Sequence, residues 1–266
     1  MPKKLLLTVI LMTFGLFAGE HYARVEPIER ATVKAAVAGE VLEANLSLEG
    51  RQVSNAVVVQ LDDRLDRKDL DHSRLTLKLL QNNLKLTREM LPGLEGSWKR
   101  QAGYFRRLKD LATASQTQKD QAYQAMVAAQ NQYLSTRQQA INLQRSILEI
   151  EQKIAALEDR IAKKSLRLKN RYLYRLLVRR GEFAGIGTPL AIVDDLSRAR
   201  LVIYLSADER KNLDRLKLWL NGKKSDLKFS KIWKETDDTY LSSYRAEIVL
   251  PAGLYPFSSL VKVELK

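Results

Sequence analysis

Apolar residues recur at alternating steps of three and four along two long stretches of the chain. The first seam reads Leu70, Ser73, Leu77, Leu80, Leu84, Thr87, Leu91, Leu94, Trp98, Gln101, Phe105, Leu108 and Ala112. The second reads Ala122, Met126, Ala129, Tyr133, Thr136, Ala140, Leu143, Ile147, Ile150, Ile154, Leu157, Ile161, Lys164 and Leu168. This spacing predicts two long helices that pack as an antiparallel coiled coil within residues 64–171. Two helices of a globular bundle are the alternative, but no third apolar helix is available to complete one.

On either side of the helical stretch, apolar residues alternate over short runs, which predicts several short strands in residues 31–63 and in residues 172–196. The runs are interrupted by Gly39, Gly50, Gly181, Gly185, Gly187 and Pro189. Each half is too short to bury a core alone. We therefore expect the two halves to fold together, with Val41 and Val53 near Leu190 and Ile192.

The turn of the hairpin is placed by symmetry and by a capping signal. Ser115 followed by Gln118 is a capping box, in which the serine hydroxyl accepts a hydrogen bond at a helix start. The tip is therefore expected at about residues 112–116, with arms of about 70 to 80 Å at 1.5 Å per residue. Pro92 and Gly93 are an alternative turn signal. Because the seam resumes in phase after them, we interpret them as a kink or short loop within one arm.

Residues 197–266 alternate in a β pattern with polar turns. Ala199–Leu205 is expected to be a strand, Asp208–Leu216 a short helix, and Leu218–Leu265 a run of strands. A small antiparallel β-barrel fits this pattern best.

The N-terminal residues 1–25 carry a localisation signal. Lys3 and Lys4 precede an apolar run from Leu5 to Gly19. Lysines before such a run favour a cytoplasmic N-terminus and export of everything that follows. An uncleaved membrane anchor is the favoured interpretation, and a cleaved signal peptide and a buried core helix are the alternatives.

The formal net charge is +14, and residues 64–171 hold 22 basic against 11 acidic residues. The excess indicates a solvated basic surface or an anionic partner. The basic residues at the base of the hairpin have the same two interpretations, a solvated face or contact with anionic lipid or an acidic transporter surface. The absence of cysteine excludes disulfides, a thiol nucleophile and a lipidated cysteine.

Catalytic chemistry has little support in the sequence. The only histidines are His21 and His72, which lie far apart along the chain. The acidic run Asp62, Asp63, Asp66, Asp69 and Asp71 offers carboxylates to a cation, but it fits better as a cap and a complement to the positive end of the following helix. We expect no catalytic residue, no cofactor and no metal.

The order of these segments resembles the HlyD-type membrane fusion proteins, the periplasmic adaptors of bacterial tripartite efflux and secretion systems. The β halves resemble the biotinyl-lipoyl fold in Gly39-x-Val41, Gly50-x-x-Val53 and the run Gly187 to Asp194. The resemblance implies an elongated α+β fold. Its expected parts are an N-terminal membrane anchor (1–25), a split lipoyl-like β-sandwich (31–63 plus 172–196), a coiled-coil hairpin (64–171) and a β-barrel (197–266).

The resemblance also implies that the hairpin tip docks on an outer-membrane channel. The family pattern is an arginine, a leucine four residues later and a serine seven beyond that. Leu108 and Ser115 match, whereas Tyr104 occupies the arginine position, and Arg107 with Leu111 keeps only the first spacing. The expected docking residues are Tyr104, Arg107, Leu108, Leu111, Thr113, Ser115 and Gln116.

From these features we expect a non-enzymatic adaptor of the inner membrane, with most of its chain in the periplasm. It would bridge a transporter of the ABC or major-facilitator type to the outer-membrane channel as a homo-oligomeric ring, a hexamer by resemblance. The Gln- and Ala-rich stretch Gln116–Gln144 has few charges, so neighbouring hairpins are able to lie side by side without repulsion. The same composition also suits an ordinary polar helix surface.

Three other functions stay open. An envelope tether for polysaccharide or cell-envelope assembly would have the same fold. A biotin or lipoyl carrier subunit would need a modified lysine at the turn that the hairpin occupies. A basic coiled coil that binds nucleic acid is disfavoured by the export signal.

Overall fold

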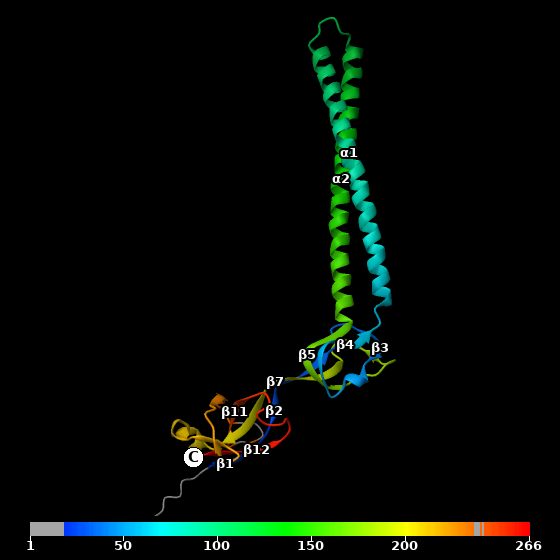
Figure 1. Ribbon diagram of the computed structural model, residues 1–266. Helices are drawn as coiled ribbons and strands as arrows, with labels where there is room; N and C mark the ends of the chain where they lie inside the picture. Colours follow the sequence, from blue (N-terminus) through cyan, green and yellow to red (C-terminus); the bar gives the residue numbers. More distant parts are fainter. Residues whose placement is uncertain (1–18, 237–239, 241) are drawn as a thin grey trace, which may run out of the picture.

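The chain is elongated, with two β regions in a row and a helical hairpin that rises from one of them (Figure 1). The computed structural model describes residues 19–236, 240 and 242–266. We call residues 31–63 with 165–195 the first β region, which carries the hairpin. Residues 19–30 with 196–266 form the second β region. The predicted elongated α+β fold with a helical hairpin and antiparallel sheets is confirmed.

In the first β region, strands from both sides of the helical stretch pair with each other. Its elements are β3 (Gly39–Ala44), the 3-10 turn Leu46–Leu48, β4 (Arg51–Leu61), β5 (Ser165–Leu176) and β6 (Phe183–Ala184). The last strand before the hairpin, β4, lies antiparallel to β5, the first strand after it, from Arg51 opposite Leu173 to Gln60 opposite Ser165. The two ends of the helical stretch are thereby held side by side.

One core joins the two halves, as the sequence predicted. Val41 and Val53 are buried in the same cluster as Leu173, Leu190 and Val193. None of these five side chains exposes more than 7% of its surface, whereas Ile192, which the sequence also placed here, lies outside the cluster and is only half-buried. Burial of a Val or Leu side chain contributes about 1.5–3 kcal/mol, so the pairing of distant halves is what makes this small region stable.

A two-stranded ribbon connects the two β regions. The 17-residue strand β7 (Pro189–Leu205) pairs through its first part with β5 and through its last part with β11 (Tyr244–Pro251). Strand β2 (Glu26–Lys34) runs beside β7 along most of its length. Because β7 belongs to both regions, the division expected after residue 196 lies inside a continuous strand.

The hairpin consists of α1 (Arg64–Lys109) and α2 (Gln116–Lys163). The predicted seams face each other. The residues buried on α1 include Leu70, Ser73, Leu84 and Thr87, and those on α2 are Ala122, Thr136, Ala140, Ile147 and Leu157. Each of these residues stands in a predicted seam, so the heptad interpretation is confirmed where the helices pack. Asp66, which is also buried on α1, precedes the predicted seam, and Ala112, its last predicted position, is exposed in the tip loop.

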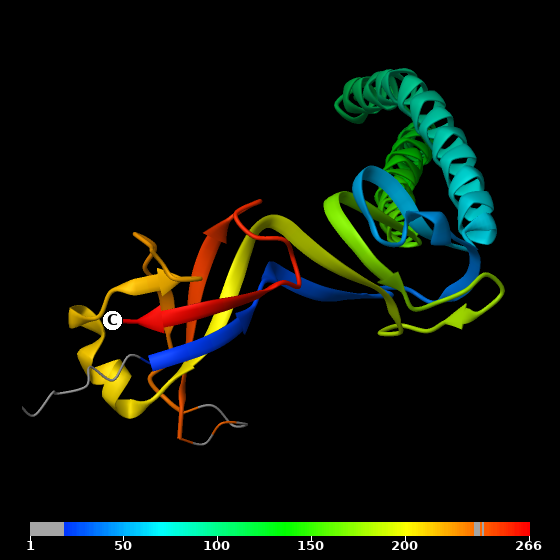
Figure 2. The same cartoon turned by 60° about the horizontal axis from the view of Figure 1, so that its bottom comes forward.

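Pro92 neither turns the chain nor opens a loop, because α1 continues through it without a break. Proline lacks the N–H that would bond to the carbonyl four residues earlier, so a local bend is expected there. Figure 2 shows α1 as an arc that passes over α2. Of the two sequence interpretations, a kink or a short loop, the continuous helix excludes the loop.

The second helix ends earlier than the sequence predicted. The second seam was extended to Leu168, and the hairpin to residue 171, but α2 ends at Lys163 and β5 begins at Ser165. Leu168 is buried in the core of the first β region instead. Leu166 and Leu168 stand two residues apart, a step that also suits a strand. Pairing of β5 with β4 therefore overrides the helical pattern.

The second β region contains β1 (Gly19–Arg24), α3 (Ala207–Asn212), the 3-10 turn Leu213–Arg215, β8 (Leu218–Leu220), β9 (Lys223–Lys224), β10 (Phe229–Ile232), β11 and β12 (Leu260–Leu265). The predicted barrel is not closed among the residues that the structure describes. One sheet has the order β1-β12-β8-β9, the other ends in β7-β11-β10, and no ladder joins β9 to β10. Leu227, between these two strands, packs against the core, and its N–H bonds locally to Ser225 Oγ, which takes the chain off the ladder.

The sequence assigned residues 1–25 to an anchor, but Gly19–Arg24 is a strand. It pairs with β12 along its whole length, and Ala23 and Val25 are buried in the core of the second β region. These long-range contacts are invisible to a local hydropathy pattern. The rest of the expected anchor, residues 1–18, lies outside the described residues. Within the described part of the chain, no helix has the length and apolar character that a membrane crossing needs.

Candidate functional site

The tip of the hairpin is a six-residue loop from Asp110 to Ser115. The N–H of Leu111 donates to the carbonyl of Leu108 at 3.2 Å, and the N–H of Ala114 donates to the carbonyl of Leu111 at 3.3 Å. These two turn bonds reverse the chain with few residues. The loop side chains are therefore left to face outward.

The start of α2 is fixed by the capping box that the sequence predicted. Ser115 Oγ accepts from the N–H of Gln118 at 3.2 Å, and Gln118 Oε1 accepts from the N–H of Ser115 at 3.0 Å. Gln116 Nε2 donates to Asp120 Oδ1 at 2.9 Å. Ser115 and Gln116, two of the seven expected docking residues, thus use their side chains to hold the helix end.

Five of the seven expected docking residues line one hollow at the tip, with a volume of about 470 Å³. Its walls are Tyr104, Arg107, Leu108, Leu111, Thr113, Ala114 and Gln118. Half of the Tyr104 surface and 53% of the Leu111 surface are exposed. The hollow therefore combines apolar walls with a phenol and a guanidinium group, a mixture typical of a protein-binding surface.

Tyr104 occupies the position at which the expected pattern has arginine, but the hollow still contains a guanidinium group. Tyr104, at the position where the pattern has arginine, and Leu108 line the same hollow as Arg107. A guanidinium group is thus present in this surface, supplied by the residue before Leu108 rather than from four residues before it. Ser115 does not line the hollow, because it caps α2.

A second groove of about 440 Å³ continues from the hollow along α1 and shares Tyr104 and Arg107 with it. Lys99, Arg100, Gln101 and Gly103 complete its walls. Lys99 Nζ lies 2.6 Å from Glu95 Oε1, and this bond raises the pKa of Lys99 above its ordinary value. Sequence reasoning missed the groove, although the run of basic residues from position 99 was its signal.

The last turn of α1 is strongly positive. Arg106, Arg107 and Lys109 lie in it, and none of them forms an ion pair with a described residue. Basic side chains here complement the negative end of the helix dipole. Because no described acidic side chain pairs with them, these three cations are left unneutralised at the tip.

Two aromatic pairs hold the arms together below the tip. Phe105 and Tyr123 have ring centroids 5.4 Å apart at 55°. Trp98 and Tyr133 are stacked at 5.7 Å and 13°. Such pairs contribute about 0.5–1.5 kcal/mol beyond area burial. They keep the two walls of the hollow in fixed relation, and Tyr123 is the member that the seams did not include.

At the base of the hairpin, the acidic run is engaged by basic side chains. Asp62 pairs with Arg64 at 2.8 Å, and Asp63 pairs with Arg67 at 2.7 Å. Asp62 Oδ1 also accepts from the N–H of Arg64, and these bonds lower the pKa of Asp62. The described residues hold no cluster of three or more metal-ligating side chains.

Asp66 is the buried member of this run. Its carboxylate lies between Lys164 Nζ, at 2.5 Å, and Arg160 Nη1, at 3.3 Å. The hydrogen bond from Lys164 lowers the pKa of Asp66 below its ordinary value. Lys164 Nζ also donates to the carbonyl of Asp62, so one lysine ties the end of α2 to the start of α1.

Three solved structures are similar to this chain over nearly its whole length. MacA from Actinobacillus actinomycetemcomitans aligns with a TM-score of 0.72 and 13% identity, over 94% of this chain and 78% of that chain. The membrane fusion protein Spr0693 from Streptococcus pneumoniae R6 aligns with a TM-score of 0.52 and 10% identity, over 93% and 97%.

A MacA-MexA chimeric protein that contains the Pseudomonas aeruginosa MexA α-hairpin domain aligns with a TM-score of 0.51 and 16% identity, over 94% and 78%. By sequence, no protein-family model and no curated protein matches the chain. The similarity at these identities is one of fold, and the fold is that of the membrane fusion proteins.

Proposed function

We propose, from this shared fold, that the chain is a non-enzymatic periplasmic adaptor of the inner membrane. It would connect a transporter in the inner membrane to a channel in the outer membrane for efflux or secretion. The transporter supplies the energy, and the adaptor supplies geometry and interfaces.

The observation that carries the proposal is the position of the tip hollow. The 46 residues of α1 span about 70 Å at 1.5 Å per residue, so the hollow is held far from both β regions. A rigid rod with a mixed apolar and cationic surface at its far end is suited to reaching a second partner. Tyr104, Arg107, Leu108, Leu111 and Thr113 would make the contact with the channel.

The opposite end of the molecule would face the inner membrane. Strand β1 lies in the second β region, and the apolar run Leu5–Gly19 leads directly into it. We infer that this run anchors the chain and that the second β region seats on the transporter, of the ABC or major-facilitator type. A ring of copies, six by resemblance, would form the conduit.

The way in which the hairpin is inserted argues against a carrier subunit. In the first β region the chain leaves β4 through Asp62 and Asp63 and returns at Ser165, after the whole hairpin. A turn that presents a modified lysine has no place at this position. A mass spectrum of the native protein with no added biotin or lipoyl mass is the expected result.

The proposal is tested by photo-crosslinking in cells. A benzophenone amino acid replaces Leu108 in the tip hollow, and a second variant carries it at Leu46 in the first β region, where 45% of the side chain is exposed. We expect Leu108 to capture an outer-membrane channel, identified by mass spectrometry, and Leu46 to capture none. Absence of any channel from the Leu108 products, with the adaptor exported and intact, would overturn the proposal.

A further inference from the structure

A small pocket lies where the ribbon of β2 and β7 enters the second β region (Figure 1). It has a volume of about 170 Å³, and the side chains that line it include three arginines, Arg24, Arg30 and Arg200. Among the described residues, Glu26 is the one acidic side chain of the lining, and Ser258 adds a hydroxyl group. We call this the junction pocket. Its lining is rich in cations and hydrogen-bond donors.

The donors of the junction pocket come from three separate parts of the chain. Arg24 ends β1, Arg200 lies in β7, and Ser258 belongs to the loop between β11 and β12. Main-chain bonds join two of these parts. The N–H of Val25 donates to the carbonyl of Ser259, and the N–H of Ser258 donates to the carbonyl of Val25, both at 2.9 Å. The pocket is thus built by long-range folding, and its donors approach a bound group from more than one side.

Arg30 is a fixed wall of the pocket and carries a balanced charge. Its Nε and Nη2 donate to the two carboxylate oxygens of Asp194, each at 2.8 Å, and its guanidinium carbon lies 4.3 Å from the centroid of the Tyr174 ring. The hydrogen bonds to Asp194 raise the pKa of Arg30 above its ordinary value. A bidentate pair that also stacks on an aromatic ring holds the guanidinium plane in place. The other two arginines therefore decide the charge of the pocket.

Arg24 has no acidic partner among the described residues. Its Nη2 donates to Ser258 Oγ at 2.8 Å. A guanidinium group has five N–H donors, so this bond leaves most of them able to bind another acceptor. The side chain is exposed, so a solute reaches it from solvent. Arg24 is therefore a charged donor that the fold does not neutralise.

The backbone of Ser258 indicates that its hydroxyl is used. Its φ of 67° lies in the left-handed region that favours glycine, where a serine is strained. The serine side chain nevertheless stands there and holds Arg24. Because the hydroxyl oxygen accepts from Arg24, its hydrogen remains free to bind a further acceptor. Ser258 and Arg24 thus form a preset pair of donors on one side of the pocket.

Arg200 is held loosely by its acidic neighbours. Its Nε lies 3.3 Å from Glu26 Oε2, and its Nη1 lies 3.4 Å from Glu247 Oε1. Both distances exceed the roughly 2.7–3.2 Å that is usual for such bonds. Arg245 binds the same oxygen of Glu247 at 2.9 Å. Since Glu247 is shared with this closer arginine, Arg200 keeps part of its charge for another anion.

Glu26 is the carboxylate that competes for this site. Its side chain is 42% exposed, and its long contact with Arg200 is weak at the protein surface. A carboxylate in that position is able to turn toward solvent when a stronger anion arrives. We therefore expect Glu26 to lower the affinity of the pocket for an anion without excluding it.

We propose that the junction pocket binds a phosphate group, either free phosphate or that of a small soluble molecule, with Arg24, Arg200 and Ser258 as the donors. A planar carboxylate is satisfied by a single guanidinium fork. A tetrahedral phosphate has oxygens in several directions, which matches donors from three parts of the chain. The guanidinium groups gathered around so small a space also repel each other, and a bound anion relieves that repulsion.

The position of the pocket favours a solute over a lipid headgroup as the source of the phosphate. Strand β1 runs from Gly19 to Arg24, and five steps of about 3.3 Å carry the chain roughly 17 Å. The apolar run that is proposed to anchor the chain ends at Gly19. A headgroup at the end of that anchor would lie near Gly19 and not near Arg24. This step uses the anchor of the proposed function, whereas the pocket itself does not depend on it.

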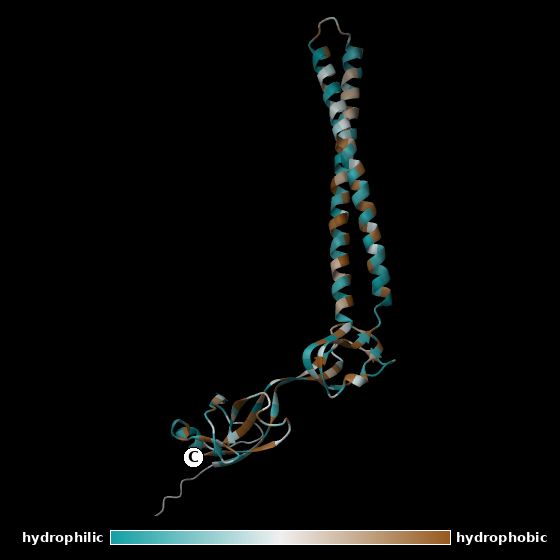
Figure 3. Ribbon diagram, viewed as in Figure 1, coloured by the Kyte–Doolittle hydropathy of each residue, from teal (hydrophilic) through white to brown (hydrophobic). Residues whose placement is uncertain are grey.

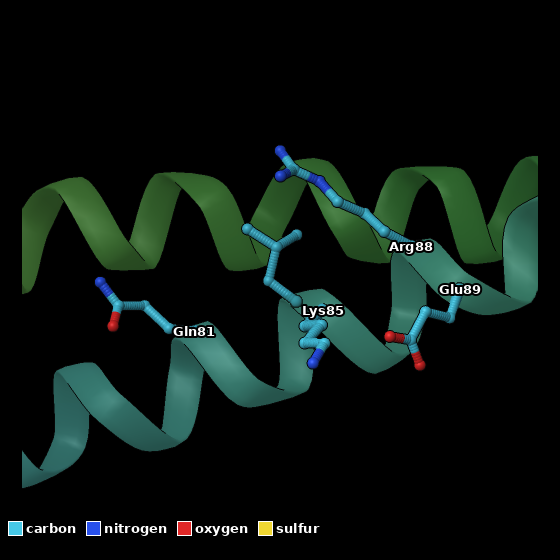
Figure 4. Close-up of a pocket in the computed structure, with 5 residues that line it drawn as sticks. Gln81, Lys85, Arg88 and Glu89 are labelled. Atoms are coloured by element: carbon cyan, nitrogen blue, oxygen red, sulfur yellow. The ribbon is translucent and has the colours of Figure 1, made fainter.

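The hairpin supplies a matched control. Hydrophilic and hydrophobic residues are mixed along both of its arms (Figure 3), and a groove of about 440 Å³ on α1 also contains cations, Lys85 and Arg88. These two side chains point in different directions, with Arg88 toward α2 and Lys85 away from it (Figure 4). Arg88 is therefore a cation in a hollow whose charged groups do not converge.

Calorimetric titration of the purified full chain with inorganic phosphate tests the site. The protein is kept in a neutral detergent, and the ionic strength is held constant with chloride. We expect one saturable phosphate site per chain and a higher melting temperature when phosphate is bound. Arg24→Gln should weaken binding roughly tenfold or more, the effect of one hydrogen bond to a charged group, and Arg88→Gln should bind as the wild type does. No saturable binding, or equal losses in the two variants, would overturn the site.

Two further variants separate binding from folding. Ser258→Gly removes the donor hydroxyl and relaxes the left-handed backbone, so we expect the melting temperature to be kept and phosphate binding to weaken. Glu26→Gln removes the competing carboxylate, so we expect tighter binding. Wild-type affinity in Ser258→Gly, or weaker binding in Glu26→Gln, would contradict the proposed arrangement of donors.

Two competitors identify the ligand class. Phosphatidylglycerol mixed into the detergent micelles and acetate in solution are each added to the protein with phosphate bound. We expect neither of them to displace phosphate at an equal concentration. Displacement by the lipid would assign the pocket to a headgroup, and displacement by acetate would assign it to a carboxylate. Either result overturns the proposal.

These outcomes are independent of those of the proposed function. Phosphate binding in a protein that captures no channel at Leu108 leaves the junction pocket standing and removes the bridging role. Channel capture by a protein that binds no phosphate removes the junction pocket alone.

Discussion

The base and the tip of the hairpin are built on opposite principles. At the base, Asp66 is buried between Lys164 and Arg160, and Arg74 pairs with Glu158 across the arms. At the tip, the cations of the last α1 turn have no acidic partner among the described residues, and the hollow remains open. Interactions at the base therefore hold the two arms in place. Those at the tip are left available for another molecule.

The largest effect on folding is expected from the packed part of the hairpin. Leu157 is 5% exposed, and Leu157→Ala removes a seam side chain close to the base. We expect a loss of about 2–5 kcal/mol in the free energy of unfolding, because the cavity adds to the lost burial. Thermal melts followed by circular dichroism measure it.

The matched control for that variant is Leu111→Ala in the tip hollow, where the side chain is 53% exposed. Its expected change in stability is within about 0.5 kcal/mol, since exposed side chains contribute little. Equal losses for the two variants would remove the distinction between a packed base and an open tip.

The ion pairs at the base give the next largest effect, with a defined pH dependence. Asp66→Asn leaves Lys164 without its carboxylate, and we expect a loss of about 1.5–3 kcal/mol at neutral pH. The pKa of Asp66 is lowered in the folded state. Its contribution is therefore complete above the unfolded value of about 3.9 and disappears as the pH falls through the folded value.

Urea denaturation of the wild type and Asp66→Asn at pH 7 and at pH 3 measures this contribution. The difference between the two proteins should shrink at the lower pH. A difference that is the same at both pH values would show that the negative charge of Asp66 does not stabilise the fold.

A smaller effect is expected at the start of α2. Ser115→Ala removes the hydroxyl that accepts from Gln118 N–H, and a lost cap costs about 1 kcal/mol. Hydrogen exchange should rise in the first turn of α2 and stay unchanged near Leu157. The neighbouring exposed Thr117→Ala is the control, and equal exchange in both variants would contradict the capping role.

The smallest effect on stability, with the largest effect on partner binding, is expected for Arg107. Arg107→Ala removes a cation from both tip grooves but breaks no ion pair with a described residue. We expect an unchanged melting temperature and reduced channel capture from Leu108, with partial recovery in Arg107→Lys. Capture at the wild-type level would remove the cationic tip from the docking surface.

What the sequence predicted well depends on local spacing. The coiled-coil seam follows from steps of three and four, so Leu70, Leu84 and Ile147 were placed correctly. The capping box at Ser115 is also local, and it located the tip. Five lining residues of the tip hollow were among those that the family resemblance implied, but Ala114 and Gln118 were not. The only local signal at Gln118 was its capping role, and Ala114 gave none.

What the sequence missed depends on contacts between distant residues. Strand β1 was included in the anchor because its partner β12 lies more than two hundred residues away. Leu168 was placed in the seam because only pairing with β4 identifies it as part of a strand. The second β region is open because no hydrogen-bonded ladder joins β9 to β10 among the described residues. No local sequence pattern indicates that this pairing is absent.

The claim that the molecule bridges two membranes is tested most directly by two crosslinkers in the same cells. One variant carries the benzophenone at Leu108 in the tip hollow, and the other at Tyr22 on β1, where the side chain is 63% exposed. We expect Leu108 to capture an outer-membrane channel and Tyr22 to capture an inner-membrane transporter. Capture of the same partner at both positions, or of a channel at Tyr22 and a transporter at Leu108, would contradict it.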